Sequence, residues 1–244
     1  MNRLLLIAML LLALPAFAGE AEIRQALKAR LPNVRIDGVQ PAPMPGLYEI
    51  RFQGRGGPQL LYADPQGTYF IDGSLIEAKS GRNLTEERLQ KLTAIEFSAL
   101  PLDLAVKVQR GNGKRVLAMF SDPYCPYCRR LEQTLLQIDD LIVYVFMYPV
   151  IRPDLADHSR AVWCAPDRAK AWLELAVGDT PKVPAGGASC PNPVDKVLEL
   201  GRSLHVTGTP TLFFANGERA SGALEVGRLR ARLDEIARAP TRKN

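Results

Sequence analysis

The sequence predicts an α/β protein built from a small α+β domain, a helical linker and a larger α/β domain. Three observations predict this division. The chain has 244 residues, more than one typical domain, and 47% of them are apolar. Strand-like and helix-like segments alternate only after about residue 114, as they do in parallel sheets. Two cysteines in the stretch SDPYCPYCRRLEQ, residues 121–133, stand where a strand-like segment meets a helix-like one.

Residues 1–18 differ from the rest of the chain. Arg3 precedes an unbroken apolar run from Leu4 to Leu14, and the small-residue pattern Ala16-Phe17-Ala18 follows. This order predicts a secretory signal peptide. A membrane anchor is the alternative, but eleven apolar residues fall short of the roughly 20 that span a bilayer. We therefore expect an exported protein in an oxidising compartment, where disulfides persist.

The charge pattern indicates solvated surfaces. The formal net charge is +5, and Lys and Arg are interspersed with Asp and Glu along the chain. Such interspersion is not the clustered basic footprint of a nucleic-acid-binding protein. We expect neither a nucleic-acid partner nor a cofactor.

Residues 19–82 are expected to form the small first domain. A short helix is predicted from Glu22 to Leu31, and strand-sized segments follow at 47–52, 59–62 and 68–71. A domain of roughly 60 residues without a disulfide has a marginal core. We therefore expect this domain to bury further surface against a second copy.

Residues 83–100 are expected to form a helical linker. Asn83 is a candidate N-cap with Glu86 three positions later, and apolar residues recur at helical spacing as far as Ile95. The pattern predicts an amphipathic helix that runs to about Leu100.

Residues 101–244 are expected to form the second domain. Strand-like segments at 115–120 and 141–147 flank a helix predicted from about 125 to 136, which is the spacing of a βαβ unit. The later segments are two helical regions, a strand, a hairpin turn and a closing helix, expected at 157–177, 194–205, 211–215, Asn216-Gly217 and 226–238. The order β-α-β, helical insertion, β-β-α is that of a thioredoxin-like domain.

The pair Cys125 and Cys128 is expected to be a redox pair. At a strand-to-helix junction, Cys125 lies at the helix N-terminus, where unpaired N–H groups and the helix dipole stabilise a thiolate. We therefore expect Cys125 to be a solvent-reachable nucleophile and Cys128 to resolve the mixed disulfide. Pro126 suits the first helical turn, because its missing N–H has no intrahelical partner there. Asp122 is expected to be a loop or capping residue.

Other roles for this pair are disfavoured. A structural disulfide between Cys125 and Cys128 would close a loop too short to stabilise the fold much. A zinc site would need closely paired ligands, but 25 residues separate Cys164 from Cys190. The two histidines, His158 and His205, are not near a cysteine pair in the sequence.

Cys164 and Cys190 are expected to form a static disulfide. It would join the Pro- and Gly-rich loop 180–193 to the helical insertion and stabilise the fold by about 3 kcal/mol. A second redox pair is the alternative.

The chain resembles the DsbC/DsbG family of periplasmic thiol:disulfide interchange proteins over nearly all of the sequence that follows the signal peptide. FSDPYCPYC is similar to the family's active-site strand and motif, and HVTGTPTLFFANG to its later active-site loop. VWCAPDRAKAW is similar to its helical insertion, and DGVQPAPMPGLYEI to the start of its dimerisation module. The dipeptide Pro126-Tyr127 looks like the DsbG branch, whereas the pair Cys164 and Cys190 looks like the DsbC branch.

The resemblance implies roles for individual residues. Cys125 would be the nucleophile and Cys128 the resolving cysteine, with Pro126 tuning their redox properties. The Thr209-Pro210 peptide would be cis and lie beside the sulfurs, leaving the backbone groups of Thr209 to pair with an extended substrate. Tyr127 is a candidate substrate contact, with ordinary packing as the alternative.

The resemblance also implies an activity and partners. The protein would be a homodimeric, periplasmic disulfide isomerase that reshuffles wrong disulfides in misfolded exported proteins and is kept reduced by a DsbD-like membrane reductase. Two alternatives stay open. One is a DsbG-like dimeric chaperone that also reduces oxidised single cysteines, and the other is a dithiol oxidase.

Overall fold

The computed structural model describes residues 19–54, 56–178 and 181–238. The predicted signal peptide, residues 1–18, lies outside these ranges. The chain divides into two compact units between Leu89 and Gln90, and each unit is described by itself. Within the described ranges, no helix is both long and apolar enough to cross a bilayer.

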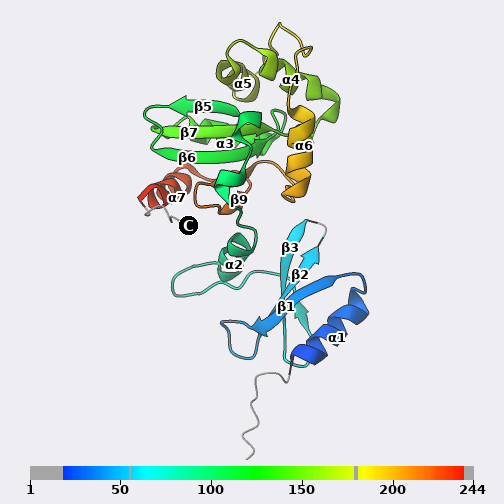
Figure 1. Cartoon of the computed structure of the whole chain (residues 1–244). Helices are drawn as coiled ribbons and strands as arrows, with labels where there is room; N and C mark the ends of the chain where they lie inside the picture. The colour runs from blue at the N-terminus through cyan, green and yellow to red at the C-terminus, as the bar shows by residue number, and fades with distance from the viewer. Residues whose placement is uncertain (1–18, 55, 179–180, 239–244) are drawn as a thin grey trace, which may run out of the picture. The chain divides into compact units, whose positions relative to one another are not determined.

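The first unit is an antiparallel sheet with a helix beside it (Figure 1). The sheet has the order β1-β2-β3-β4. Its elements, with the helix that ends the unit, are α1 (Glu20–Arg30), β1 (Arg35–Pro41), β2 (Tyr48–Gly54), β3 (Gly57–Ala63), β4 (Phe70–Ile71) and α2 (Leu84–Leu92). The buried core cluster is small and consists of Ile23, Leu27, Ile50 and Ala63; Phe52, Leu60 and Tyr62 are also buried.

Two features of this region differ from the sequence prediction. Strand β1 was not predicted, because its segment RIDGVQP contains Gly and Pro and shows no regular alternation; pairing with β2 makes it a strand. The predicted linker helix ends at Leu92 rather than near Leu100. The N–H of Ile95, which the helical pattern included, instead donates to the carbonyl of Gly217 over 3.0 Å. The predicted cap is confirmed, since Asn83 Oδ1 accepts the N–H of Glu86 over 3.0 Å.

The second unit has the predicted thioredoxin-like α/β fold with a helical insertion. Its five-stranded sheet has the order β5-β7-β6-β8-β9, in which β6 and β7 are parallel and the other pairs antiparallel. The strands are β5 (Val106–Arg110), β6 (Arg115–Ser121), β7 (Leu141–Met147), β8 (Thr211–Phe214) and β9 (Arg219–Ser221). The helices are α3 (Pro126–Leu135), α4 (Ala156–Cys164), α5 (Arg168–Ala176), α6 (Val194–Ser203) and α7 (Val226–Arg238). Short 3₁₀ turns lie at Phe97–Ala99, Leu102–Leu104 and Pro153–Leu155.

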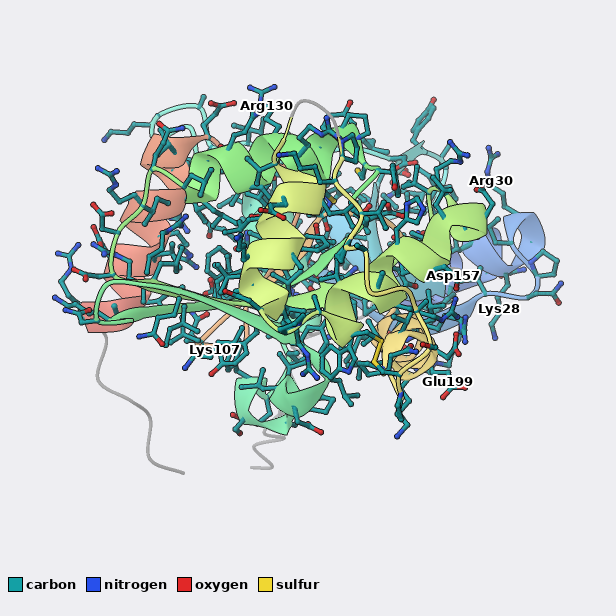
Figure 2. The ribbon with its side chains drawn as sticks, turned by 90° about the horizontal axis from the view of Figure 1, so that it is seen from above. Lys28, Arg30, Lys107, Arg130, Asp157 and Glu199 are labelled. Carbon is teal, nitrogen blue, oxygen red and sulfur yellow. A yellow bond between two sulfur atoms is a disulfide. The ribbon has the colours of Figure 1, made fainter. Side chains whose placement is uncertain are left out.

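The sheet of the second unit has a core on each face, because successive side chains of a strand point to opposite sides. Leu117 and Met119 of β6 lie in one core with buried residues of α3, α5 and α7. Ala118 and Phe120 of the same strand lie in the other core with Val197 of α6. Four exposed charged side chains, Lys107, Arg130, Asp157 and Glu199, are labelled in Figure 2.

Two details of the second unit also differ from the prediction. Strand β5 was not predicted, although Val106 and Val108 alternate with polar residues and are buried. The predicted helical region 157–177 is two helices, since Pro166 follows the end of α4 and cannot continue it. The Asp167 carboxylate caps the second helix by accepting the N–H of Lys170 over 3.0 Å.

A buried carboxyl group joins α3 to α5. Glu132 is 4% exposed, and Trp172 Nε1 donates to its Oε1 over 2.6 Å. Burial raises the pKa of Glu132 from 4.5 to about 7, against the opposing effects of the Trp172 hydrogen bond and the Arg110 charge. The folded chain therefore holds a proton here between about pH 4.5 and 7, whereas the unfolded chain has released it.

We predict that this proton makes the fold less stable as the pH rises through that window. Glu132→Gln keeps an acceptor for Trp172 but cannot titrate. The difference in unfolding free energy, variant minus wild type, should therefore increase by about 3 kcal/mol between pH 4.5 and 7.5. Denaturant unfolding at the two pH values measures the difference. The exposed Glu199→Gln on α6 is the matched control, and a Glu132→Gln difference that does not change with pH contradicts the prediction.

Candidate active site

The loop between β6 and α3 places Cys125 at the start of a helix. β6 ends at Ser121, and α3 begins at Pro126 with Cys125 as its N-cap residue. The Cys125 N–H donates to the Asp122 carbonyl over 3.1 Å. Pro126 takes the first helical position, where its missing N–H leaves no helical hydrogen bond unmade. Cys128 follows about one turn further along the helix.

The carboxylate of Asp122 holds this loop in place. Asp122 is fully buried. Its Oδ1 accepts the N–H of Tyr124 over 2.8 Å, and its Oδ2 accepts the N–H of Ile151, which lies beyond β7, over 2.7 Å. The expectation of a loop residue therefore understates its contacts, because the same carboxylate also joins the loop to the segment that follows the neighbouring strand.

The two sulfur atoms have different partners. Both cysteines are free thiols. The Cys125 S–H donates to the Thr209 carbonyl over 3.2 Å, whereas Cys128 Sγ accepts the N–H of Asp122 over 3.4 Å. Cys125 is 3% exposed and Cys128 1%. Cys125 is therefore much less open to solvent than the sequence predicts, because the Thr209 loop covers its sulfur.

The Thr209-Pro210 loop lies beside the cysteines, as the resemblance implies, but one of its backbone groups is not free. The Thr209-Pro210 peptide is cis, and Pro210 is buried. The Thr209 carbonyl, expected to be free for a substrate strand, is occupied by the Cys125 thiol in this reduced state. Tyr127 is 64% exposed, and Pro126 beside it is also exposed. Tyr127 is thus a surface side chain rather than part of the core.

Burial strongly disfavours the thiolate of Cys128. It raises the pKa of this thiol to about 12, and the charge of a Cys125 thiolate adds to the effect. Three polar groups oppose burial and lower the pKa: the Ser121 hydroxyl, the Asp122 N–H and the Thr209 hydroxyl. Cys128 is therefore a thiol at neutral pH and needs help to become a nucleophile.

A histidine of the helical insertion contacts the active-site loop. The Tyr124 hydroxyl is hydrogen-bonded to His158 Nδ1 of α4, and Tyr124 immediately precedes Cys125 in the chain. From the sequence, His158 was a candidate only as a zinc ligand. No local pattern could have indicated this contact, because the two residues are 34 positions apart.

The other two cysteines form a disulfide. Cys164 and Cys190 are bonded with a Cα–Cα distance of 5.7 Å. Cys164 is the last residue of α4, and Cys190 lies in the loop before α6. The bond therefore joins the helical insertion to that loop.

This arrangement defines a class of protein. A free Cys-Pro-Tyr-Cys pair at the N-terminus of α3 lies beside a cis Thr-Pro loop on a thioredoxin-like sheet. A cysteine pair at a helix N-terminus is an arrangement suited to thiol–disulfide exchange, because the first sulfur is favoured as a thiolate and the second lies within reach of the mixed disulfide. The second unit is thus a thiol–disulfide oxidoreductase domain.

Comparison with known proteins identifies the family. Residues 102–237 match the thioredoxin-like domain, and residues 15–86 match the disulfide bond isomerase protein N-terminal domain. The chain is 42% identical over 212 residues to the probable thiol:disulfide interchange protein DsbC of Bordetella pertussis, covering 86% of this chain and 73% of that protein. The chain belongs to the DsbC family of thiol:disulfide interchange proteins.

Two further relatives agree with this assignment. The thiol:disulfide interchange protein DsbC of Escherichia coli (strain K12) is 27% identical over 238 residues, which cover 93% of this chain and 94% of that protein. The crystal structure of a disulfide interchange protein from Neisseria gonorrhoeae is 42% identical, with a TM-score of 0.54, and covers 57% of this chain and 100% of that one.

We predict that Asp122→Asn weakens both the fold and the reactivity of Cys125. The amide has one acceptor oxygen and one donor NH₂ group in place of two acceptor oxygens. One of the two buried N–H groups that donate to the Asp122 carboxylate therefore loses its partner. The unfolding free energy should fall by about 1–3 kcal/mol, and Cys125 should react more slowly with a small disulfide. Denaturant unfolding and stopped-flow thiol kinetics measure these effects. Asp157→Asn, at an exposed position of α4, is the control, and wild-type values for Asp122→Asn would contradict the role assigned to the carboxylate.

Proposed function

We propose that the protein is a periplasmic disulfide isomerase and reductase that reshuffles wrong disulfides in misfolded exported proteins. The observation that carries this proposal is the free pair Cys125 and Cys128 at the start of α3, with the Cys125 sulfur beside the Thr209 carbonyl. The match of residues 15–86 to an isomerase N-terminal domain supports isomerisation over simple oxidation.

The reaction begins with attack by the Cys125 thiolate on a substrate disulfide. A bond forms between Cys125 Sγ and one substrate sulfur, and the other substrate sulfur leaves as a thiolate. That freed thiolate attacks elsewhere in the substrate and ultimately releases Cys125, so isomerisation leaves the enzyme reduced. If this fails, Cys128 attacks Cys125, the substrate leaves reduced, and the enzyme disulfide must be reduced again. We propose a DsbD-like membrane reductase as the electron donor.

Deprotonation of Cys125 also prepares the substrate site. The Thr209 carbonyl accepts the S–H of the protonated sulfur, and a thiolate has no hydrogen to donate. The carbonyl then becomes available to a backbone N–H of an extended substrate segment. We propose that Thr209 and Pro210 bind this segment, that the exposed Tyr127 contacts its side chains, and that Pro126 tunes the redox pair.

Two observations support export to the periplasm. The apolar run of residues 4–14 behind Arg3 has the pattern of a signal peptide. The disulfide between Cys164 and Cys190 is of the kind that persists in oxidising compartments.

We propose that residues 19–82 form a homodimer. Among the described residues, the core cluster of the first unit has four members, and β1 and β4 are the edge strands of its sheet. It also carries a groove of about 580 Å³ lined in part by Phe52, Leu61 and Phe70. Five large apolar side chains are exposed in this unit, namely Leu31, Met44, Tyr69, Ile71 and Ile76. A second copy is the occupant that covers such a surface in a small domain.

We predict that Cys125→Ala abolishes isomerase activity. The variant lacks the attacking sulfur, so refolding of a scrambled multi-disulfide protein should proceed at the uncatalysed rate. Recovery of the refolded protein's activity over time measures the effect. Cys128→Ala should retain a substantial fraction of isomerisation, since the Cys125 route needs no resolving thiol, and equal loss in both variants would contradict the assigned roles.

A second candidate function is chaperone-like binding of unfolded chains, which the exposed apolar side chains of the first unit favour. The same Cys125→Ala variant separates the two functions. A chaperone keeps suppressing the aggregation of a thiol-free unfolded protein, whereas isomerisation is lost. The reduction potential of the cysteine pair distinguishes the dithiol oxidase alternative. An oxidase would have a potential near the −120 mV end of the roughly −270 to −120 mV range of thioredoxin-fold proteins.

We predict that removing residues 19–82 yields a monomer with oxidase-like behaviour. Without the second copy, the redox pair becomes accessible to the machinery that oxidises monomeric partners. Analytical ultracentrifugation and the redox state of Cys125 in an oxidising extract measure the outcome. A truncated protein that stays dimeric would refute this division of roles between the two units.

A further inference from the structure

The hydroxyl group of Ser121 is a spare hydrogen-bond donor beside the redox pair. Ser121 is the last residue of β6 and is fully buried. Its backbone carbonyl accepts the N–H of Tyr148 over 2.8 Å, which fixes the main chain. Among the described residues, however, its Oγ has no hydrogen-bond partner of ordinary geometry. A buried hydroxyl without a partner is costly and calls for a role.

Ser121 directly precedes a residue that contacts the sulfur of Cys128. The residue that follows Ser121, Asp122, donates its N–H to Cys128 Sγ over 3.4 Å, so the end of β6 lies against this sulfur. The Ser121 hydroxyl lowers the pKa of the Cys128 thiol and is the largest of the effects that oppose its burial. No other group in the described part of the chain uses the hydroxyl, so it is available when the sulfur becomes charged.

We propose that Ser121 is a catalytic residue whose hydroxyl donates to the Cys128 thiolate and thereby sets the rate of the resolving step. Within the ranges that the structure describes, the hydroxyl has no hydrogen-bond partner while the sulfur is a neutral thiol, but the sulfur becomes a strong acceptor for a charge-assisted hydrogen bond once it has lost its proton. Ser121 thus acts on the second cysteine of the pair and not on the first, whose sulfur contacts Thr209 instead.

The step is a displacement at sulfur. Cys128 loses its proton to solvent, and its thiolate attacks Cys125 Sγ in the mixed disulfide. The bond between Cys125 and Cys128 forms as the bond between Cys125 and the substrate breaks, and the electron pair leaves with the substrate thiolate, which takes up a proton. The enzyme dithiol is oxidised by two electrons and the substrate disulfide is reduced.

The expected effect follows from two opposing changes. Loss of the donor lowers the thiolate fraction of Cys128, because this thiol is far from deprotonated at neutral pH. Each tenfold loss of thiolate is offset about threefold by the higher nucleophilicity of a more basic sulfur. For a thiolate loss of about ten- to a hundredfold, resolution slows by about three- to tenfold.

A slower resolving step leaves the mixed disulfide more time to rearrange. The Ser121 hydroxyl therefore shifts the enzyme from isomerisation toward reductive release. This consequence rests on the proposed isomerase function, whereas the kinetic role of Ser121 does not.

The test uses the reduced protein and one equivalent of 5,5′-dithiobis(2-nitrobenzoate). The first thionitrobenzoate is released as Cys125 attacks the reagent, and the second as Cys128 attacks the mixed disulfide. The second release is unimolecular, so its rate does not depend on concentration. Ser121→Ala should slow the second release by about three- to tenfold and leave the first within about twofold.

Two further comparisons make the test specific. Ser159→Ala removes another fully buried hydroxyl that lacks a partner among the described residues, on α4, and should change neither phase. The side chains of Ser121→Thr and Ser121→Val have nearly the same shape, but only Thr carries a hydroxyl group. A faster second release in the Thr variant than in the Val variant therefore shows the effect of the hydroxyl even if Ser121→Ala folds poorly. An unchanged second release in Ser121→Ala, equal slowing in Ser159→Ala, or equal rates for the Thr and Val variants each overturn the proposal. The reagent is a small disulfide, so this test measures only the resolving step. A negative result would reject the role of Ser121 without rejecting the isomerase function, which the refolding experiment tests.

Discussion

The active site depends on Asp122, a buried residue of the loop between β6 and α3 that uses all of its polar groups. Its carboxylate accepts the N–H groups of Tyr124 and Ile151, its carbonyl accepts the N–H of Cys125, and its own N–H donates to Cys128 Sγ. These four contacts fix where the helix begins. Because a sulfur at the helix N-terminus is the one that the helix dipole activates, we propose that these contacts also fix which cysteine attacks.

The two sulfurs consequently face different surroundings, and this asymmetry is the basis of the chemistry. Cys125 donates to the Thr209 carbonyl, which we propose a substrate takes over, whereas burial raises the pKa of Cys128 to about 12. An easily displaced contact suits a nucleophile that must engage a bulky partner. A thiol that seldom ionises suits a resolving group that acts only when rearrangement has failed. The polar groups around its sulfur set the lifetime of the mixed disulfide.

The redox motif and the thioredoxin-like order were predictable, because each has a local signal in the sequence. What could not be predicted depends on contacts between distant segments. Strand β1 exists because β2 pairs with it, and Ile95 leaves the helical pattern because Gly217 accepts its N–H. The contact of His158 with Tyr124 and the pairing of Asp122 with Ile151 have the same origin. The burial of Cys125 was missed because it is set by a loop 84 residues away.

The central claim is that the Asp122 loop makes Cys125 the attacking sulfur and Cys128 the resolving one. Trapping the covalent intermediate tests it most directly. Cys128→Ser and Cys125→Ser variants are each mixed with a disulfide-bonded peptide, and the adducts are mapped by mass spectrometry after an acid quench. The account predicts rapid accumulation of the peptide on Cys125 in Cys128→Ser and almost none on Cys128 in Cys125→Ser. Adducts that form equally fast on either cysteine would contradict it.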